Sequence, residues 1–128
     1  MNWWYWQDYP TERRWAWSTT DVKEGASVPV ILDSCWPWGA VWDAAFPPPE
    51  FDAIPPRPPS GAYHPFCINR HNGCVNGLFL DWSVRRVGLK ELWMLKWNRQ
   101  YNTRGPWTKA GGVQPEQWPQ WMRRFKDY

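Results

Sequence analysis

His71 and Asp81, ten residues apart, are the two side chains whose types and spacing first suggest chemistry in this chain. An imidazole and a carboxylate can share a metal ion, or a hydrogen bond that ties two segments together. The Asn72-Gly73 pair between them has the residue types that a two-residue hairpin turn requires. Because a strand rises about 3.3 Å per residue, a straight hairpin would hold the two side chains about 20 Å apart. We therefore expect separate structural roles, His71 as a hydrogen-bonding residue and Asp81 as the anchor of a turn or of a neighbouring backbone N–H.

The remaining residues give little support for a catalytic site. The chain has two histidines, His64 and His71, and its serines lie in no nucleophile motif. The two acids of a glycoside hydrolase face each other across a cleft, which Glu50 and Asp52 cannot do from neighbouring loop positions. The sequence therefore predicts a protein that is not an enzyme.

The three cysteines, Cys35, Cys67 and Cys74, do not have the spacing of a zinc site. Cys67 and Cys74 lie on opposite sides of the Asn-Gly turn and could form a disulfide if they fall opposite each other. A pair that includes Cys35 is the other disulfide, and small buried apolar side chains are the third reading. The sequence leaves these alternatives open.

Tryptophan dominates the apolar composition, with 14 Trp and 14 Pro among 128 residues and few aliphatic side chains. Each indole has a large apolar surface and an N–H group that needs a partner when it is buried. We therefore expect some rings to stay exposed, where they would contact neighbouring subunits or stack on sugars. The candidate residues for assembly or glycan contact are Trp3, Trp4, Tyr5, Trp6, Trp15, Trp17, Trp36, Trp38 and Trp42.

Charge and hydropathy exclude several classes of partner. The net charge of +3 is small and spread along the chain, without the concentrated basic stripe of a nucleic-acid-binding protein. No apolar run approaches the roughly 18 to 20 residues that cross a bilayer, so no membrane span is expected in this chain. The first residues lack the order of a secretory signal. The chain is therefore expected to be cytoplasmic, or its export segment lies outside this sequence.

The elements that must position these residues are short. Asp21 and Glu24 have the spacing of a capping pair for one helical turn, and residues 27–33 read as a buried strand. Residues 34–65 are predicted to be loop, with a proline-rich part at 43–65. Seven prolines between residues 47 and 59 exclude helix there and favour extended polyproline geometry.

A hairpin is predicted from residues 62–70 and 74–87, joined at the Asn-Gly turn. Residues 89–97 have helical apolar spacing, and a last helix is expected near Trp118 with Pro119 at its first position. The tryptophans at helical spacing in these two segments are expected in the core: Trp93, Trp97, Trp118 and Trp121. The sequence thus predicts an α+β fold: a small antiparallel sheet with a central hairpin, short helices and long Pro/Trp-rich loops. One domain is expected over residues 1–128, with an aromatic arm at residues 1–20.

Two blocks of the sequence resemble a known family. FCINRHNGCVNGLFLDWSVRRVGLKELWMLKW and GPWTKAGGVQPEQWPQWMRRFKDY are similar to the C-terminal region of prepilin-type, type II secretion pseudopilin-like proteins of planctomycete-like bacteria, which have an H-x9-D-G signature. TTDVKEGASVPVILDSCW resembles the strand segment that precedes this region. The resemblance covers roughly residues 18–36 and 66–128, and it makes His71 and Asp81 the signature pair.

The resemblance implies a pilin-like head and a structural role, in a bacterial cell-surface or extracellular filament or a pseudopilus-like assembly. Trp82 stands where the family has glycine, so no tight turn is expected there. The resemblance does not include the family's leader and long apolar helix, so the chain is expected to be a processed or truncated form of such a protein, or a subunit that assembles by a different contact. Self-association would then use the aromatic arm and the proline loop, by strand addition or indole–proline packing. The alternative class is a carbohydrate-binding module that binds polysaccharide through exposed tryptophans.

The resemblance also raises calcium, because pseudopilin heads of this kind can bind it through loop oxygens. The available carboxylates are Asp33, Asp43, Glu50 and Asp52. The chain lacks the D-x-D-x-D-G pattern that organises such oxygens into a calcium loop. We therefore expect no cofactor, with calcium as the alternative.

Overall fold

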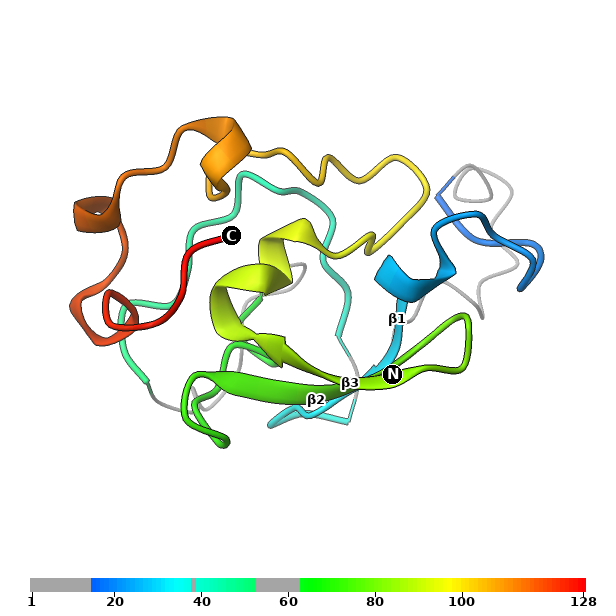
Figure 1. Cartoon of the computed structure of the whole chain (residues 1–128), viewed down its shortest axis with the longest axis horizontal. Helices are drawn as coiled ribbons and strands as arrows, with labels where there is room; N and C mark the ends of the chain where they lie inside the picture. The colour runs from blue at the N-terminus through cyan, green and yellow to red at the C-terminus, as the bar shows by residue number, and fades with distance from the viewer. Residues whose placement is uncertain (1–14, 38, 53–62) are drawn as a thin grey trace.

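Three strands form one antiparallel sheet in the computed structural model (Figure 1). Their order is β1-β2-β3, from β1 (Pro29–Leu32) through the central β2 (Cys74–Phe79) to β3 (Val84–Gly88). This sheet confirms the predicted small α+β fold. The structure describes residues 15–37, 39–52 and 63–128.

The hairpin lies at a different place from the predicted one. Residues 63–70 form turns rather than a strand, with the N–H groups of Phe66 and Cys67 both bonded to the Tyr63 carbonyl. The predicted second strand, 74–87, instead divides into β2 and β3, which pair from Cys74↔Gly88 to Leu78↔Val84. The prediction was wrong because a second turn, within residues 80–83, folds this segment back on itself.

The Asn-Gly turn is present, but it leads into β2 instead of joining two strands. Asn72 and Gly73 both have positive φ, at 50° and 82°. The Gly73 N–H donates to the side-chain oxygen of Asn69 at 2.7 Å. The local turn chemistry was therefore predicted, while the strand on one side of it was not.

β1 lies within the predicted strand 27–33 and pairs with β2. Its register shifts between Pro29, which pairs with Phe79, and Ile31, which pairs with Leu78. Proline is tolerated here because it begins an edge strand. Opposite Leu32 stands Gly77, where any side chain would collide with the leucine methyl group. This glycine, which breaks the alternation of β2, makes room for a core leucine.

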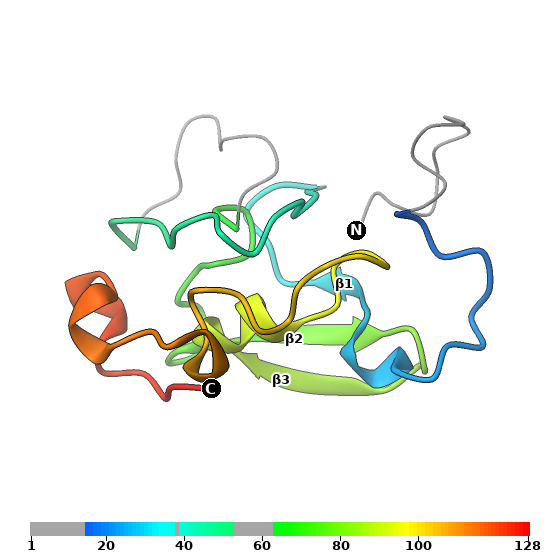
Figure 2. The same cartoon turned by 90° about the horizontal axis from the view of Figure 1, so that it is seen from above.

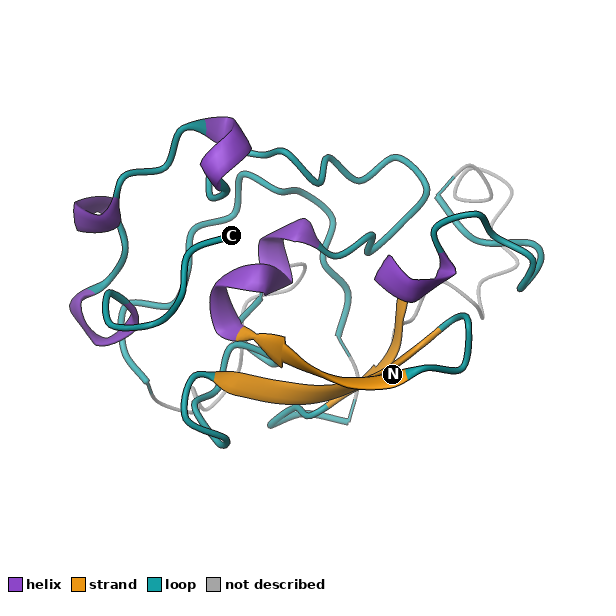
Figure 3. Ribbon diagram, in the orientation of Figure 1, coloured by secondary structure: helices purple, strands orange, loops and turns teal. Residues whose placement is uncertain are grey.

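The predicted helices form as 3-10 turns (Figure 3). η3 (Leu89–Met94) is shorter than the predicted helix 89–97 because the backbone of Leu95 is extended. Trp118 is extended because it precedes Pro119. The helical turn predicted after Asp21 lies later in the chain, because η2 begins at Gly25, and Glu24 before it makes no side-chain cap bond. The described helical elements are η2 (Gly25–Ser27), η3 (Leu89–Met94), η4 (Lys109–Gly111), η5 (Pro115–Gln117) and η6 (Gln120–Met122). No helix among the described residues is long and apolar enough to cross a membrane.

The core is aromatic, as the helical spacing of the tryptophans predicted. Trp93, Trp97 and Trp118 are buried, and Tyr63 stacks on Trp93 with 4.0 Å between ring centroids. The Trp93 N–H donates to the carbonyl of Phe46 in the proline-rich loop at 2.9 Å. Indole donors thus satisfy loop carbonyls, which fixes part of that loop on the core.

Candidate functional site

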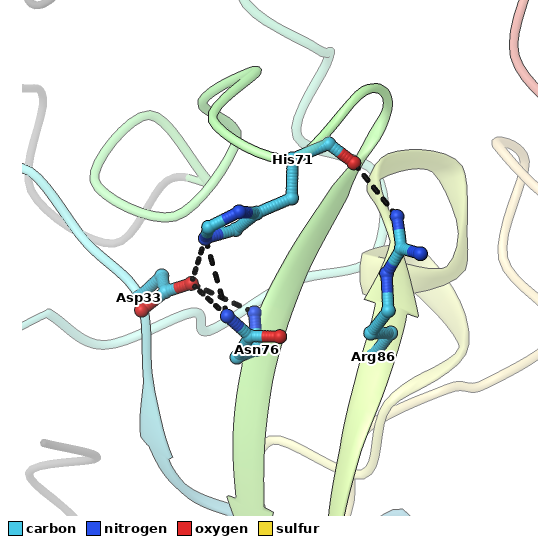
Figure 4. Close-up of polar contacts among 4 residues, drawn as sticks. All are labelled: Asp33, His71, Asn76 and Arg86. Atoms are coloured by element: carbon cyan, nitrogen blue, oxygen red, sulfur yellow. Dashed lines mark hydrogen bonds and ion pairs between the residues drawn. The ribbon is translucent and has the colours of Figure 1, made fainter.

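His71 binds Asp33, not its signature partner Asp81. Its Nε2 lies 3.1 Å from Asp33 Oδ2, and the Asn76 side-chain amide contacts both groups at 3.1 Å (Figure 4). On β3, Arg86 Nη2 donates to the His71 carbonyl at 2.9 Å. The cluster therefore joins the end of β1, β2 and β3 across the solvent-facing side of the sheet. All its members keep exposed or half-buried side chains, as a structural clasp at a surface does.

Asp81 anchors the turn between β2 and β3. Its Oδ1 accepts hydrogen bonds from the Ser83 N–H at 3.0 Å and the Ser83 hydroxyl at 2.6 Å. These two bonds lower the pKa of the Asp81 carboxyl below its ordinary value, because they stabilise the charged form. Asp81 is therefore anionic at neutral pH and holds the turn in place.

Trp82 occupies this turn in the left-handed region, with φ of 67°. Its N–H donates to the Phe79 carbonyl at 2.9 Å, and the Phe79 N–H donates to the Ser83 carbonyl at 2.9 Å. The expectation that tryptophan in place of glycine would exclude a tight turn is therefore wrong. The backbone hydrogen bonds of the turn and the Asp81 side chain hold Trp82 in a conformation that glycine adopts more easily.

An apolar row crosses the outer face of the sheet beside this turn. Ile31, Leu78 and Val84 lie opposite one another in register, and Ile31 is 50% and Val84 73% exposed. Trp82, in the adjoining turn, is also 73% exposed. We call Ile31, Leu78, Trp82 and Val84 the tip surface. It places apolar area in solvent at one end of the β2–β3 hairpin.

A pocket of about 280 Å³ lies at the other end of the same hairpin. It is lined by Cys74 and Gly88, the strand pair at that end, and by Arg124, Phe125, Lys126 and Tyr128 of the C-terminal segment. That segment is held to the protein by Lys90, whose fully buried side chain reaches Asp127 at 2.6 Å. The hairpin thus has an apolar tip at one end and a pocket at the other.

No protein-family model, curated protein or solved structure matches this chain. Its function must therefore be argued from this geometry.

The carboxylates considered for calcium do not come together. Asp33 is engaged by His71 and Asn76, while Asp43 and Asp52 accept backbone N–H groups of Ala45 and Asn69. Within residues 15–37, 39–52 and 63–128, no group of three metal-ligating side chains is assembled.

The cysteines are free thiols. Cys67 is buried in the core with its Sγ 4.0 Å from the Met122 sulfur, and burial raises the pKa of its thiol. Cys35 is half-buried, and burial raises its pKa as well. Cys67 is therefore a small buried apolar side chain, which was one of the three alternatives from the sequence. Cys74 lines the pocket.

The tryptophans predicted to make contacts differ in how exposed they are. Trp15, Trp17 and Trp36 are half-buried, and Trp42 is 37% exposed. Trp82, which was not among the candidates, is more exposed than any of these four. The sequence signal that could have identified Trp82 is its position between Asp81 and Ser83, two residue types that are common in turns. The other candidates, Trp3, Trp4, Tyr5, Trp6 and Trp38, lie outside the described residues.

Proposed function

We propose that this chain is the pilin-like head of a structural subunit that self-associates into a filament at the cell surface or outside the cell. The observation that supports it is Trp82, an exposed indole on a left-handed backbone. The resemblance to pseudopilin-like heads points in the same direction. The contact that we assign to assembly is the tip surface, in place of the N-terminal arm named from sequence.

Trp82 supports a contact role because the isolated molecule gains little from it. A residue other than glycine in the left-handed region costs about 1 to 3 kcal/mol. With 73% of its surface exposed, Trp82 recovers little of that cost by burial within its own chain. Glycine would make the same turn without strain. Large aromatic side chains are the residues that most often anchor protein interfaces, so an interface accounts for the indole.

The rest of the tip surface extends the same contact. Ile31 and Val84 add exposed apolar area in register with Leu78. β3 is an edge strand of the described sheet, and it presents Arg85 and Arg86. Charged residues on an edge strand oppose strand-to-strand association. The proposed contact is therefore made by side chains of the tip surface, without strand addition.

The test replaces Trp82 by glycine and measures assembly by sedimentation velocity and negative-stain imaging. We expect Trp82→Gly to be folded, at least as heat-stable as the wild type, and monomeric at concentrations where the wild type forms large species. The matched control is Phe51→Ala, which removes another 73% exposed apolar side chain that is not part of the tip surface and should still assemble. A wild-type chain that stays monomeric at every concentration, or a glycine variant that assembles normally, would refute the proposal.

Carbohydrate binding is the second candidate, and the same indole favours it. Trp82 is flanked by Asp81 and Ser83, polar residues of the kind that accompany a sugar-stacking ring. A saturable change in tryptophan fluorescence on adding polysaccharide, lost in Trp82→Gly, would support this function. High-mass species formed without any glycan would support assembly instead.

A further inference from the structure

The pocket at the Cys74–Gly88 end of the hairpin exists because two glycines admit aromatic rings. Any side chain at Gly73 would collide with the Phe125 ring, and any side chain at Gly88 with the Tyr128 ring. The rings can therefore settle directly on the backbone at this end of β2 and β3. The ion pair between the buried side chain of Lys90 and the half-buried Asp127 holds the segment that carries them.

The rim of this pocket carries two positive charges that lack acidic partners. The Arg124 guanidinium lies 5.0 Å from the Phe125 ring centroid, and Lys126 Nζ lies 4.6 Å from the Tyr128 ring centroid. In the described part of the chain neither cation forms an ion pair. The nearby acids are already used, Asp127 by Lys90 and Glu91 by Arg85 at 2.6 Å. The pocket therefore suits an apolar group that carries negative charge beside it.

The tip of the hairpin has that combination. Trp82 follows Asp81, which is anionic at neutral pH because the Ser83 bonds lower its pKa. The segment next to the turn adds two exposed acids, Asp21 and Glu24, against one lysine, Lys23. This segment lies close, since a Cβ at Gly25 would stand 3.2 Å from Asp81 Cβ. The tip is thus apolar and acidic, and the pocket is aromatic and basic.

The two surfaces cannot meet within one molecule. The β2–β3 turn and the C-terminal segment lie at opposite ends of the hairpin in both views (Figures 1 and 2). Between them stand the five strand pairs from Cys74↔Gly88 to Leu78↔Val84, a span of about 14 Å. A contact between unlike surfaces at opposite ends repeats from copy to copy and builds an open chain or a ring.

We infer that the pocket formed by Gly73, Cys74, Gly88, Phe125 and Tyr128, with Arg124 and Lys126 at its rim, receives the Trp82 tip of a second copy of this chain. The contact is head-to-tail, with indole in the pocket and Asp81 beside the two cations. This inference rests on the proposed function and names the partner of the tip surface. It gives the assembly a direction along the hairpin.

The experiment mixes two variants that each lack one of the two surfaces. Trp82→Gly removes the tip, and Arg124→Glu with Lys126→Glu reverses the charge of the pocket rim. Each variant alone should sediment as a monomer, because the intact surface has no complement. Their equimolar mixture should form a species of twice the monomer mass and nothing larger, since one tip and one pocket remain.

A charge-matched control is Arg99→Glu with Arg104→Glu, two exposed arginines away from the pocket, which should assemble as the wild type does. If the pocket variant alone assembles normally, or if the mixture stays monomeric while the wild type assembles, the head-to-tail contact is wrong and the proposed function stands. If the wild type itself never assembles, the proposed function fails with it.

A second measurement does not depend on these variants folding well. Ser83→Cys places a thiol beside Trp82, and Cys74 supplies a thiol that lines the pocket. With diamide as the oxidant, disulfide-linked oligomers should appear on a non-reducing gel. They should be absent when Cys74→Ser is added. Linkage that persists without Cys74 would overturn the assignment of the pocket.

Discussion

Two side chains of this protein are held in energetically unfavourable local environments, and each has a measurable consequence. Trp82 holds a left-handed backbone at the surface. His64 has a buried Nδ1 with no hydrogen-bond partner in the described part of the chain. The proposed interface accounts for the strained backbone of Trp82. The second has a consequence for stability, because burial of an imidazole disfavours its charged form.

Burial lowers the pKa of His64 below its ordinary value of 6.5. As the pH falls through 6.5, the unfolded chain binds a proton at this position before the folded chain does, so the free energy of unfolding decreases. The stability contributed by neutral His64 is therefore complete above about pH 7 and declines towards pH 5. Urea unfolding at half-unit pH steps should show this decline, and His64→Gln should flatten it.

The control is His71→Gln, which retains His64 and should retain the decline. A His64→Gln variant with the same pH dependence as the wild type would show that this histidine does not contribute to it.

Elements are held together here by a few buried contacts between short segments, and the C-terminal segment depends on one of them. Lys90, on η3, has a fully buried side chain, and its Nζ lies 2.6 Å from Asp127 and 5.0 Å from the Trp118 ring centroid. Removing one member of a buried ion pair leaves an uncompensated charge. Loss of this ion pair is therefore expected to destabilise the attachment of the C-terminal segment.

Asp127→Ala should lower the free energy of unfolding by about 2 to 4 kcal/mol, because it leaves the Lys90 ammonium buried without its carboxylate. Lys90→Met combined with Asp127→Ala should be less destabilising than Asp127→Ala alone, since the orphan charge is gone. Chemical denaturation of the two single variants, the double variant and the wild type measures the coupling. Additive effects of the two substitutions would show that the pair does not interact.

Element types were predictable from this sequence where one local signal acted alone. Residues 27–33 gave β1, and tryptophans at helical spacing gave core positions. The hairpin was misplaced because two turn signals compete between residues 70 and 88, and the Asn-Gly pair looked stronger than the Asp81-anchored turn. Tertiary bonds decided the outcome, since β2 pairs with β1 as well as with β3.

The site was less predictable than the fold. His71 and Asp81 make separate contacts, with Asp33 and with Ser83, and the sequence could not name Asp33 as the partner of His71. That contact requires β1 to lie beside β2, which is a pairing of residues more than forty positions apart. Trp82 was missed because propensity places glycine at a left-handed position, and the tryptophan found there departs from that rule.

At the scale of the whole molecule, the proposed contact between unlike surfaces at opposite ends of one hairpin would determine how an assembly grows. An isologous contact stops at a dimer, whereas a head-to-tail contact leaves one free tip and one free pocket on every oligomer. The proposed subunit therefore has no preferred final size unless the chain closes into a ring. Growth should be limited by molecules that can occupy one end but cannot extend it.

Trp82→Gly is such a molecule, because it keeps the pocket and lacks the tip. Added to the wild type, it should bind the free tip of a growing chain and stop extension there. With one variant molecule per ten wild-type molecules, the mean length should fall to about ten copies. The pocket variant, Arg124→Glu with Lys126→Glu, should stop growth equally well from the other end. A chain that combines all three substitutions has neither surface, so it should leave the length distribution unchanged. Filament lengths measured from negative-stain images separate these outcomes, and a length that ignores either single-surface variant would contradict directional growth.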